Sequence, residues 1–562
     1  MKNLLFCSSR LAVAGLLLAS TSALRAAAGR VASPSGALGI TFTLDSNGSP
    51  LFSVDYLGRP LVLPSRLGLP ANLAANLAAS ATRTENHDAV WENPRGERRR
   101  VPDRYNALSV DLRSREGERG SLTFRAYDEG AAFIFVAPEG GAQNAATDTD
   151  RTEFHFPPNT RTSPASAATG DAPLILAAVR ASEIRDPLTI TLADGRFASL
   201  ATLREAPWKI ILVGRDPAQL LERNYLALNF TAPSALADTS WIRPGRVLRD
   251  FAPTLAGAKA AADYGVTAGF RYICAGRAWT EPGFDVPALV GYARERDLGV
   301  ILRVADQPQP GELETTLRQF ARWGVRGAEI ALPPGAAHTA TLWLAPAAAL
   351  AAQLHLILAV PRTLATAERI RAWPHVFAVA TERASRPTDA ATENCTLPFS
   401  RGPLGFAPFS ELRTDGVSPA HRLALGVISS DPLASVSWAE RPEADSRAHD
   451  HEFLRRVPTV WDDTKALAGA SGRYLALARR SRDDWFVGAI NGSDARALGL
   501  SLAFLDPGRA YIAHLYTDSP PGASPQKTVY AYRKVVSTER IDLALATGGG
   551  TAIWLTPDSK RR

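Results

Sequence analysis

Short apolar or alternating runs, each bounded by Gly, Asp or Pro, dominate the N-terminal part of the chain. Alternation with a period of two predicts β-strands, because neighbouring side chains of a strand point to opposite faces. The predicted strands are 38–44, 51–56, 108–112, 122–127 and 132–136. We therefore expect residues 29–233 to form an N-terminal β-sandwich. Two stretches that lack the pattern, 85–103 and 139–150, are predicted to be long surface loops.

From residue 242 onward the pattern changes to continuously apolar runs that alternate with helical stretches. Such runs are typical of strands in a parallel sheet covered on both faces. They are 265–274, 299–304, 327–332, 356–360 and 376–380, with helices predicted at 286–296, 312–323, 346–353 and 364–373. This spacing favours a central (β/α)8 TIM-like barrel at 242–463 over an open doubly wound sheet. Alternating runs return at 464–562, where we expect a C-terminal β-sandwich.

Length and composition indicate a multidomain soluble protein. The chain has 562 residues, of which 46% are hydrophobic and 21% charged, as in ordinary globular proteins. Its formal net charge is +7, and three of the positive charges (Lys2, Arg10 and Arg25) lie in the N-terminal leader. The remaining charge is too small to argue for nucleic acid as a partner. Neither GxGxxG after a strand nor GxxxxGK followed by Ser or Thr occurs, so nucleotide-binding folds lose their main support.

The first 28 residues predict a secretory signal peptide. Lys2 and Arg10 precede the apolar stretch 11–19, and a run of three alanines at 26–28 supplies a cleavage site. The apolar stretch is shorter than the roughly 20 residues that cross a bilayer, and no later segment predicts a membrane span. We expect the mature protein in the periplasm or outside the cell.

Cysteine and histidine positions give no metal-binding pattern. Only Cys274 and Cys395 remain once the leader is removed, and neither has CxxC spacing. Their spacing leaves open whether they pair. The run His449–Glu452 (HDHE) contains ligand types, but it lies within the charged stretch 447–456 and predicts a solvated helix face.

Several distinctive words punctuate the chain. They are 64–68 (PSRLG), 104–108 (RYNAL), 124–130 (FRAYDEG), 207–211 (PWKII), 238–245 (DTSWIRPG), 396–401 (TLPFSR), 457–462 (VPTVWD) and 485–492 (WFVGAING). In these words the chain resembles glycoside hydrolase family 97, the bacterial α-glucosidases and α-galactosidases, over essentially the whole mature chain. The resemblance implies a saccharide as the ligand and an N-terminal sandwich that packs against the barrel and contributes to its cleft.

Glycoside hydrolysis requires two carboxyl groups, one as proton donor and one as nucleophile or base. In retaining members of the family the nucleophilic Asp ends the fourth barrel strand, and the corresponding word here, 324–332 (GVRGAEIAL), has Ala331 at that place. Alanine cannot attack. Glu329 precedes it by two positions and should point to the same side of the strand. Glu329 is therefore a candidate catalytic carboxylate, and the alternative is a deeper, paired polar residue.

Two further candidates follow the sixth barrel strand, where the resemblance implies two Glu residues six positions apart. This chain retains Glu382 but has Thr388 at the second place, with Asp389 next to it. Glu382 and Asp389 are therefore candidate catalytic residues. The alternative for Glu382 is a loop carboxylate neutralised by a neighbouring arginine. After the fifth strand, the family's acidic or His-containing word is replaced by 358–362 (LAVPR).

Other positions are candidate saccharide contacts, because strand ends face the active-site mouth in barrels of this type. They are Asp250, Trp279, Arg303 and Asp306, for which the alternative is salt bridging or packing. The family's glucosidases also bind calcium through carboxylates, one from the N-terminal domain. Thr202 stands at that place here, so we expect no calcium and no other cofactor.

Two functions remain open. The first is an exo-acting α-glycosidase whose catalytic carboxylates have moved to Glu329, Glu382 or Asp389. The second is a noncatalytic relative that binds a carbohydrate or a partner through the old cleft. The resemblance favours the first, and the missing carboxylates favour the second.

Overall fold

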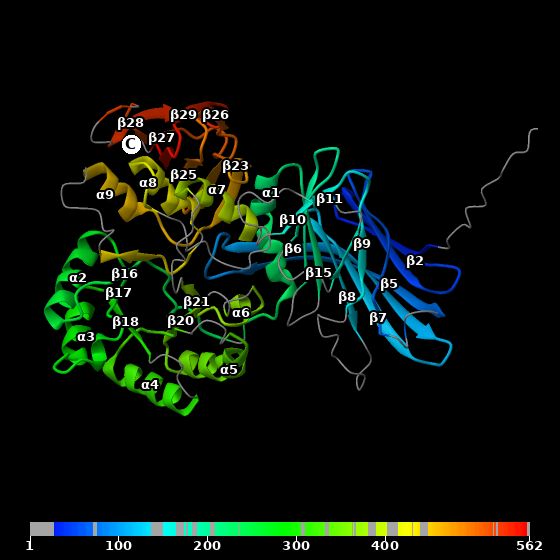
Figure 1. Cartoon of the computed structure of the whole chain (residues 1–562), viewed down its shortest axis with the longest axis horizontal. Coiled ribbons are helices and arrows are strands. Elements are labelled where there is room, and N and C mark those ends of the chain that lie inside the picture. Colours follow the sequence, from blue (N-terminus) through cyan, green and yellow to red (C-terminus); the bar gives the residue numbers. More distant parts are fainter. Residues whose placement is uncertain are drawn as a thin grey trace, which may run out of the picture.

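The chain forms three domains (Figure 1). The computed structural model describes residues 27–558 except 71–72, 74–75, 137–149, 165–173, 176–177, 182–187, 203–207, 235, 305–309, 332–336, 362–363, 365–366, 380–388, 402–413, 430, 439–447, 521 and 524–526. Most of the predicted signal peptide and the predicted loop 139–150 lie outside these residues. The order of the domains is an N-terminal sandwich, a barrel and a C-terminal sandwich, as predicted.

The N-terminal domain is a β-sandwich of two antiparallel sheets. One sheet has the order β1-β2-β3-β4-β9-β12 and the other β11-β10-β13-β14-β15-β8-β7-β6-β5. The strands are β1 (Ala27–Ala32), β2 (Leu38–Leu44), β3 (Pro50–Tyr56), β4 (Arg59–Arg66), β5 (Leu77–Glu92), β6 (Arg100–Ser114), β7 (Arg119–Ala126), β8 (Gly130–Val136), β9 (Glu153–His155), β10 (Arg161–Pro164), β11 (Leu174–Ile175), β12 (Ala178–Arg180), β13 (Leu188–Thr191), β14 (Phe197–Thr202) and β15 (Lys209–Gly214). Alternate side chains, such as Phe42, Phe52 and Phe124, fill the core between the sheets.

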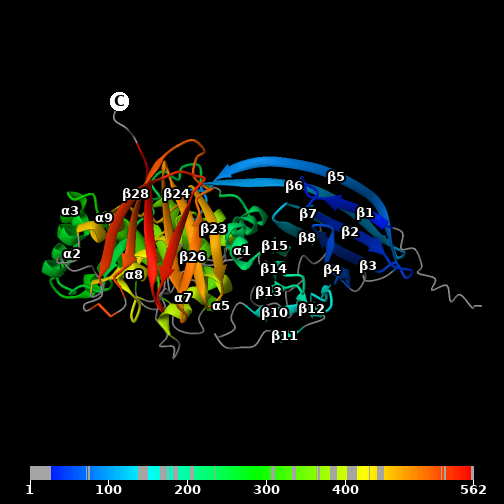
Figure 2. The same ribbon diagram turned by 90° about the horizontal axis from the view of Figure 1, so that it is seen from above.

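The predicted loop at 85–103 is wrong. Its residues belong to the long hairpin of β5 and β6, which curves from the sandwich toward the C-terminal domain (Figure 2). β5 is an edge strand, and nearly all of its side chains are exposed on both faces. No face of β5 is buried, so its sequence lacks the apolar–polar alternation by which strands are recognised.

The barrel domain contains a parallel sheet with the order β21-β20-β19-β18-β17-β16-β22. The strands are β16 (Val247–Arg249), β17 (Tyr272–Cys274), β18 (Gly299–Arg303), β19 (Gly327–Glu329), β20 (Ile357–Pro361), β21 (Val376–Val379) and β22 (Ser435–Ser437). The last strand pairs with the first, as in a sheet that curls toward a barrel. Seven parallel strands are found in the described part of the chain.

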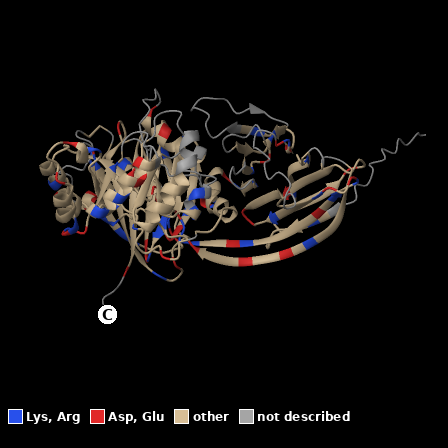
Figure 3. Ribbon diagram, turned by 90° about the horizontal axis from the view of Figure 1, so that it is seen from below, with Lys and Arg blue, Asp and Glu red and all other residues tan. Residues whose placement is uncertain are grey.

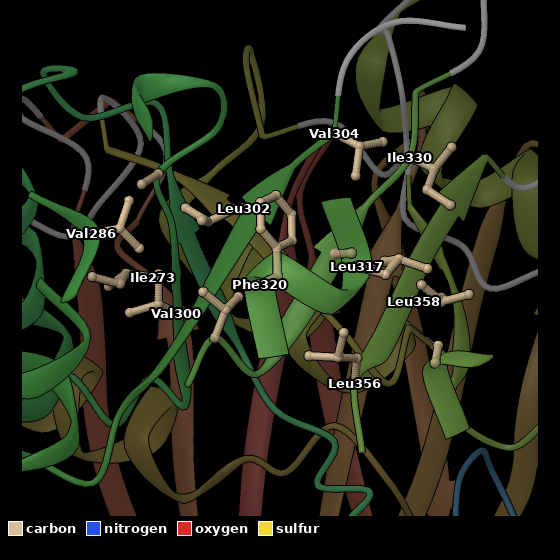
Figure 4. Packing of buried hydrophobic residues seen from close by; sticks show 14 of the residues in the cluster. Ile273, Val286, Val300, Leu302, Val304, Leu317, Phe320, Ile330, Leu356 and Leu358 are labelled. Atoms are coloured by element: carbon tan, nitrogen blue, oxygen red, sulfur yellow. The ribbon is translucent and has the colours of Figure 1, made fainter. Parts of the chain in front are cut away.

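Helices cover the outer face of this sheet. They are α2 (Leu255–Thr267), α3 (Val286–Arg294), α4 (Pro310–Trp323), α5 (Ala337–Gln353) and α6 (Ala367–Ala372), with the short η5 (Ala278–Thr280) after β17. Thr254 and Asp285 cap α2 and α3 by accepting a backbone N–H of the first turn. Val300, Leu302 and Phe320 show the resulting strand–helix core (Figure 4).

The C-terminal domain is a second sandwich-like unit. Its main sheet has the order β23-β24-β25-β30-β27-β28, and β26 pairs with β29 opposite it. The strands are β23 (Asp463–Ala470), β24 (Tyr474–Ser481), β25 (Asp484–Asn491), β26 (Arg496–Ser501), β27 (Tyr511–Asp518), β28 (Thr528–Val535), β29 (Arg540–Leu545) and β30 (Gly550–Pro557). Its other face packs against helices, which are α1 (Pro217–Glu222), α7 (Ala390–Arg401), α8 (Pro419–Ile428) and α9 (Ala448–Arg456). The charged helix predicted around His449 is therefore confirmed as α9.

The tip of the β5–β6 hairpin joins the three domains. Arg95 is buried, donates to the carbonyls of Pro374 (3.2 Å) and Val376, and lies over the Phe377 ring of the barrel. Glu97 pairs with Arg479 of the C-terminal domain at 2.5 Å. Arg479 has no exposed side-chain surface and also donates to carbonyls after α8. The hairpin therefore connects the barrel to the C-terminal domain.

Cysteine pairing and membrane spans are settled for the described residues. Cys274 and Cys395 are both free and buried, and they belong to different hydrophobic cores. Within that part of the chain, no helix is both long and apolar enough to cross a membrane.

Two buried histidines make the fold sensitive to acid. Burial lowers the pKa of His375 and of His421 to about 4, from an unfolded-state value of roughly 6.5. The unfolded chain therefore takes up protons that the folded chain refuses. The stabilisation is complete above pH 6.5, and about 3 kcal/mol per histidine is lost as the pH falls to 4.

We expect the urea midpoint to fall steeply between pH 6.5 and pH 4, and the fall to be smaller in His375→Phe. The phenylalanine keeps the ring beside Trp241 but cannot be protonated. His155→Phe, at a half-exposed ring of the N-terminal domain, is the control and should keep the wild-type slope. Equal slopes in all three proteins would contradict this assignment.

Candidate functional site

The candidate site lies where the barrel strands end. Side chains of β16–β21 alternate between the helix-covered core and the barrel interior, where Tyr272, Ile301 and Phe377 form a separate cluster. By this alternation Arg249 and Glu329, at the last positions of β16 and β19, also point inward. Strand C-terminal ends form the mouth in barrels of this type. The interior of the barrel is therefore apolar below and carries charge toward its mouth.

An ion pair crosses this interior. Arg249 donates to the Glu329 carboxylate at 2.8 Å, and Glu329 is 6% exposed. The Cys274 thiol lies 3.7 Å from the same carboxylate oxygen. Burial would lower the pKa of Arg249, but Cys274 and Glu329 raise it above its ordinary value. Burial and the Glu329 carboxylate raise the pKa of the Cys274 thiol to about 12, so the thiol is neutral and not an activated nucleophile.

Glu329 thus combines both expectations from the sequence. It points into the interior as predicted, and it is also a deep, paired polar residue. As the anionic partner of an ion pair, it has no proton to give to a leaving group. Its role as a catalytic carboxylate stays a prediction, with the function of nucleophile or electrostatic stabiliser as the one its pairing suits.

The candidate saccharide contacts are placed differently from one another. Asp250 follows β16, is exposed and has a positive φ of 58°. Arg303 ends β18 beside Glu329 in the register of the sheet. The Trp279 indole donates to the carbonyl of Arg303 at 2.8 Å, and its ring meets Phe320 edge-on. Trp279 is thereby fixed within the helix layer beneath Arg303, and a contact with saccharide stays a prediction for all three residues.

Asp389 caps a helix. Its carboxylate accepts the backbone N–H and the hydroxyl of Thr392, both at 3.0 Å, and so stabilises the first turn of α7. A catalytic role for Asp389 stays a prediction. Glu382 and Asp306 lie outside the described residues.

Arg249 is the functional-site residue that sequence reasoning missed. The word 245–251 drew attention to Asp250, whereas the arginine before it makes the ion pair. The available indication was a charge at the end of a short apolar strand, a position that turns a side chain toward the barrel interior. Among the described residues, no group of three or more His, Cys, Asp or Glu side chains is placed to hold a metal ion.

Comparison with known proteins agrees with this architecture. Residues 31–170 match the family model "Glycosyl-hydrolase 97 N-terminal", and residues 460–556 match "Glycosyl-hydrolase 97 C-terminal, oligomerisation". A Streptomyces bingchenggensis protein named "Probable retaining alpha-galactosidase" is 27% identical over 81% of this chain and 83% of its own length. The Bacteroides thetaiotaomicron "Retaining alpha-galactosidase" is 26% identical over 62% of this chain and 60% of its own length.

Solved structures match the fold. A family 97 enzyme of a Pseudoalteromonas strain, in complex with acarbose, superposes with a TM-score of 0.78 at 20% identity, covering 94% of this chain and all of that one. A β-arabinopyranosidase gives a TM-score of 0.76 at 20% identity, with the same coverage. The three-domain layout and the inward-facing mouth define a barrel protein of the glycosidase type. The chain belongs to glycoside hydrolase family 97.

Proposed function

We propose that this chain is a glycoside hydrolase that acts on α-linked saccharides at the mouth of its barrel. The observation that carries the proposal is the inward-facing pair of Arg249 and Glu329 at the strand ends, in a chain whose full-length relatives are named α-galactosidases. The pair offers an anionic oxygen and guanidinium donors at the place where a sugar enters such a barrel. Charged donors and acceptors of this kind suit the hydroxyl groups of a sugar.

Turnover should be slow in this proposal. Ala331 removes the nucleophile at its expected place, and Thr388 removes the second glutamate that the resemblance implies. Acid–base assistance alone contributes about 10²- to 10⁴-fold to such reactions. Glu329 and Glu382 are the carboxyl groups on which the remaining activity would rest, with Glu382 as proton donor.

A saccharide-binding relative without catalysis is the second candidate. The specific observation in its favour is again Glu329, because its pairing with Arg249 and its burial are what a structural carboxylate would show. Such a protein would keep the mouth and lose the chemistry.

The test is hydrolysis of nitrophenyl α-galactoside and α-glucoside, whose good leaving groups need little acid assistance. We expect slow turnover that requires folded protein and is lost in Glu382→Gln. Turnover unaffected by Glu382→Gln would exclude that residue as part of the site. Absence of turnover together with saccharide binding would favour the noncatalytic candidate.

We also propose that the protein is exported. The support is the basic start, the apolar stretch and the small-residue cleavage site within residues 1–28. N-terminal sequencing of the protein from the periplasm or the medium should begin near Gly29. Recovery of the chain with Met1 intact would show that the leader is not cleaved.

A further inference from the structure

The C-terminal domain presents one open sheet edge. Its main sheet ends in β23 on one side and β28 on the other. The β23 edge is covered by α1, where Glu222 accepts from the Lys465 ammonium at 3.1 Å and from the Ala466 backbone at 3.2 Å. β28 pairs only with β27 within the described residues. An open edge offers a row of backbone donors and acceptors to another strand.

The side chains of β28 are unusually apolar for such an edge. Tyr532 is 70% exposed, the largest value among the exposed large hydrophobic residues described, and Val529 on the opposite face of the strand is 40% exposed. Edge strands usually avoid pairing by projecting charged side chains. Here Lys534 pairs with Asp558 at 2.7 Å, and Arg533 donates to the carbonyl of Arg540 at 3.0 Å. The charges of β28 are thus engaged within the chain.

The ladder with β27 determines which backbone groups point outward. Just before β28, the N–H of Ser519 donates to the carbonyl of Lys527 at 2.9 Å, and the register continues in steps of one residue along both strands. Hydrogen-bonded pairs alternate along an antiparallel ladder. Ala531 therefore turns its N–H and C=O toward β27, whereas Tyr530 and Tyr532 turn theirs to the open edge.

We infer that β28 is a dimerisation strand that pairs antiparallel with β28 of a second copy of this chain, about a two-fold axis at Ala531. In this register Tyr530 faces Tyr532 of the second copy, and both contribute outward-pointing backbone groups. Arg533 faces Val529 of the second copy, so the two Arg533 side chains lie four positions apart, roughly 13 Å. The main sheets of the two copies become one continuous sheet.

Charge and family context favour a second copy as the occupant. Centring the axis at Tyr532 instead would bring the two Arg533 side chains to diagonal positions roughly 7–8 Å apart, where like charges repel. The family model matched by residues 460–556 describes this domain as an oligomerisation domain without assigning a surface. The other long open edge, β5, alternates Lys or Arg with Asp or Glu along the hairpin (Figure 3) and exposes mostly polar side chains.

A cysteine at the proposed axis gives the sharpest test. In the pairing described above, Ala531 faces itself as a non-hydrogen-bonded pair with a Cα separation of about 4.5 Å, which a disulfide can bridge. Mature Ala531→Cys should form a covalent dimer on mild oxidation, because the native Cys274 and Cys395 are buried. Thr84→Cys, on the β5 edge, is the matched control and should stay uncrosslinked.

Light scattering of the mature chain provides the second readout. The wild type should have twice the monomer mass, and Tyr532→Lys should be monomeric with an unchanged melting temperature, because the tyrosine ring is mostly exposed in one copy. A monomeric wild type would overturn the inference. So would a dimer that survives Tyr532→Lys, or a crosslink through Thr84→Cys in place of Ala531→Cys. None of these results depends on glycosidase activity.

Discussion

Replacing Ala331 by Asp is expected to raise the hydrolysis of nitrophenyl α-galactoside by about 10²-fold or more over the wild type. Ala331 follows β19 two positions after Glu329 and is 5% exposed, while Ile330 between them packs in the strand–helix core. Ala331 therefore points inward, and the new carboxylate would stand at the place of the nucleophile in retaining relatives. Arg249 and Arg303 on neighbouring strands supply positive charge at that side of the barrel.

Ala331→Asn is the matched control, since it has the same shape without the nucleophilic charge. It should remain at the wild-type rate. The substrate needs little acid assistance, so the missing glutamate at Thr388 does not hide the gain. Equal rates in the Asp and Asn variants, with unchanged thermal unfolding in both, would show that the saccharide does not reach Ala331.

Replacing Glu97 by Gln is expected to lower the stability of the protein by about 3–5 kcal/mol, the usual effect of leaving one partner of a buried ion pair without its counter-charge. Arg479 has no exposed side-chain surface and depends on Glu97 to balance its charge. Burial lowers the pKa of Arg479, and Glu97 opposes that shift. Calorimetry should show the first unfolding transition lowered by about 5 °C or more.

Arg99→Gln is the control from the same hairpin. Arg99 pairs with Glu92 at 3.2 Å, and both side chains are mostly exposed, at 67% and 64%. An exposed pair contributes only about 0–1 kcal/mol. If Glu97→Gln changed stability no more than Arg99→Gln, the hairpin tip would not hold the barrel and the C-terminal domain together.

The three-domain fold could be predicted because its cores impose periodicity on the sequence. Continuous apolar runs such as 299–304 and 356–360 became β18 and β20, which are buried on both faces. The hairpin of β5 and β6 could not be recognised, because β5 has no buried face to impose a pattern. Its stability comes from pairing with β6 and from the contacts of its tip, and neither leaves a mark on local sequence.

The candidate site was predictable in direction and not in detail. Period-two counting placed Glu329 on the inward side of its strand. The partner of Glu329 came from a strand 80 positions away in the sequence, and only the closed order of the sheet brings Arg249 across to it. Asp389 shows the opposite case. One residue of displacement from the expected glutamate placed it at a helix start, where a carboxylate has a structural use.

A crystal structure of the protein soaked with an α-linked galactoside tests the central claim most directly. The account predicts the sugar at the C-terminal ends of β16, β18 and β19, within hydrogen-bond distance of at least one of Arg249, Asp250 and Arg303. Sugar bound only elsewhere on the protein, or no sugar at a concentration that saturates an active family member, would contradict a saccharide site at the barrel mouth.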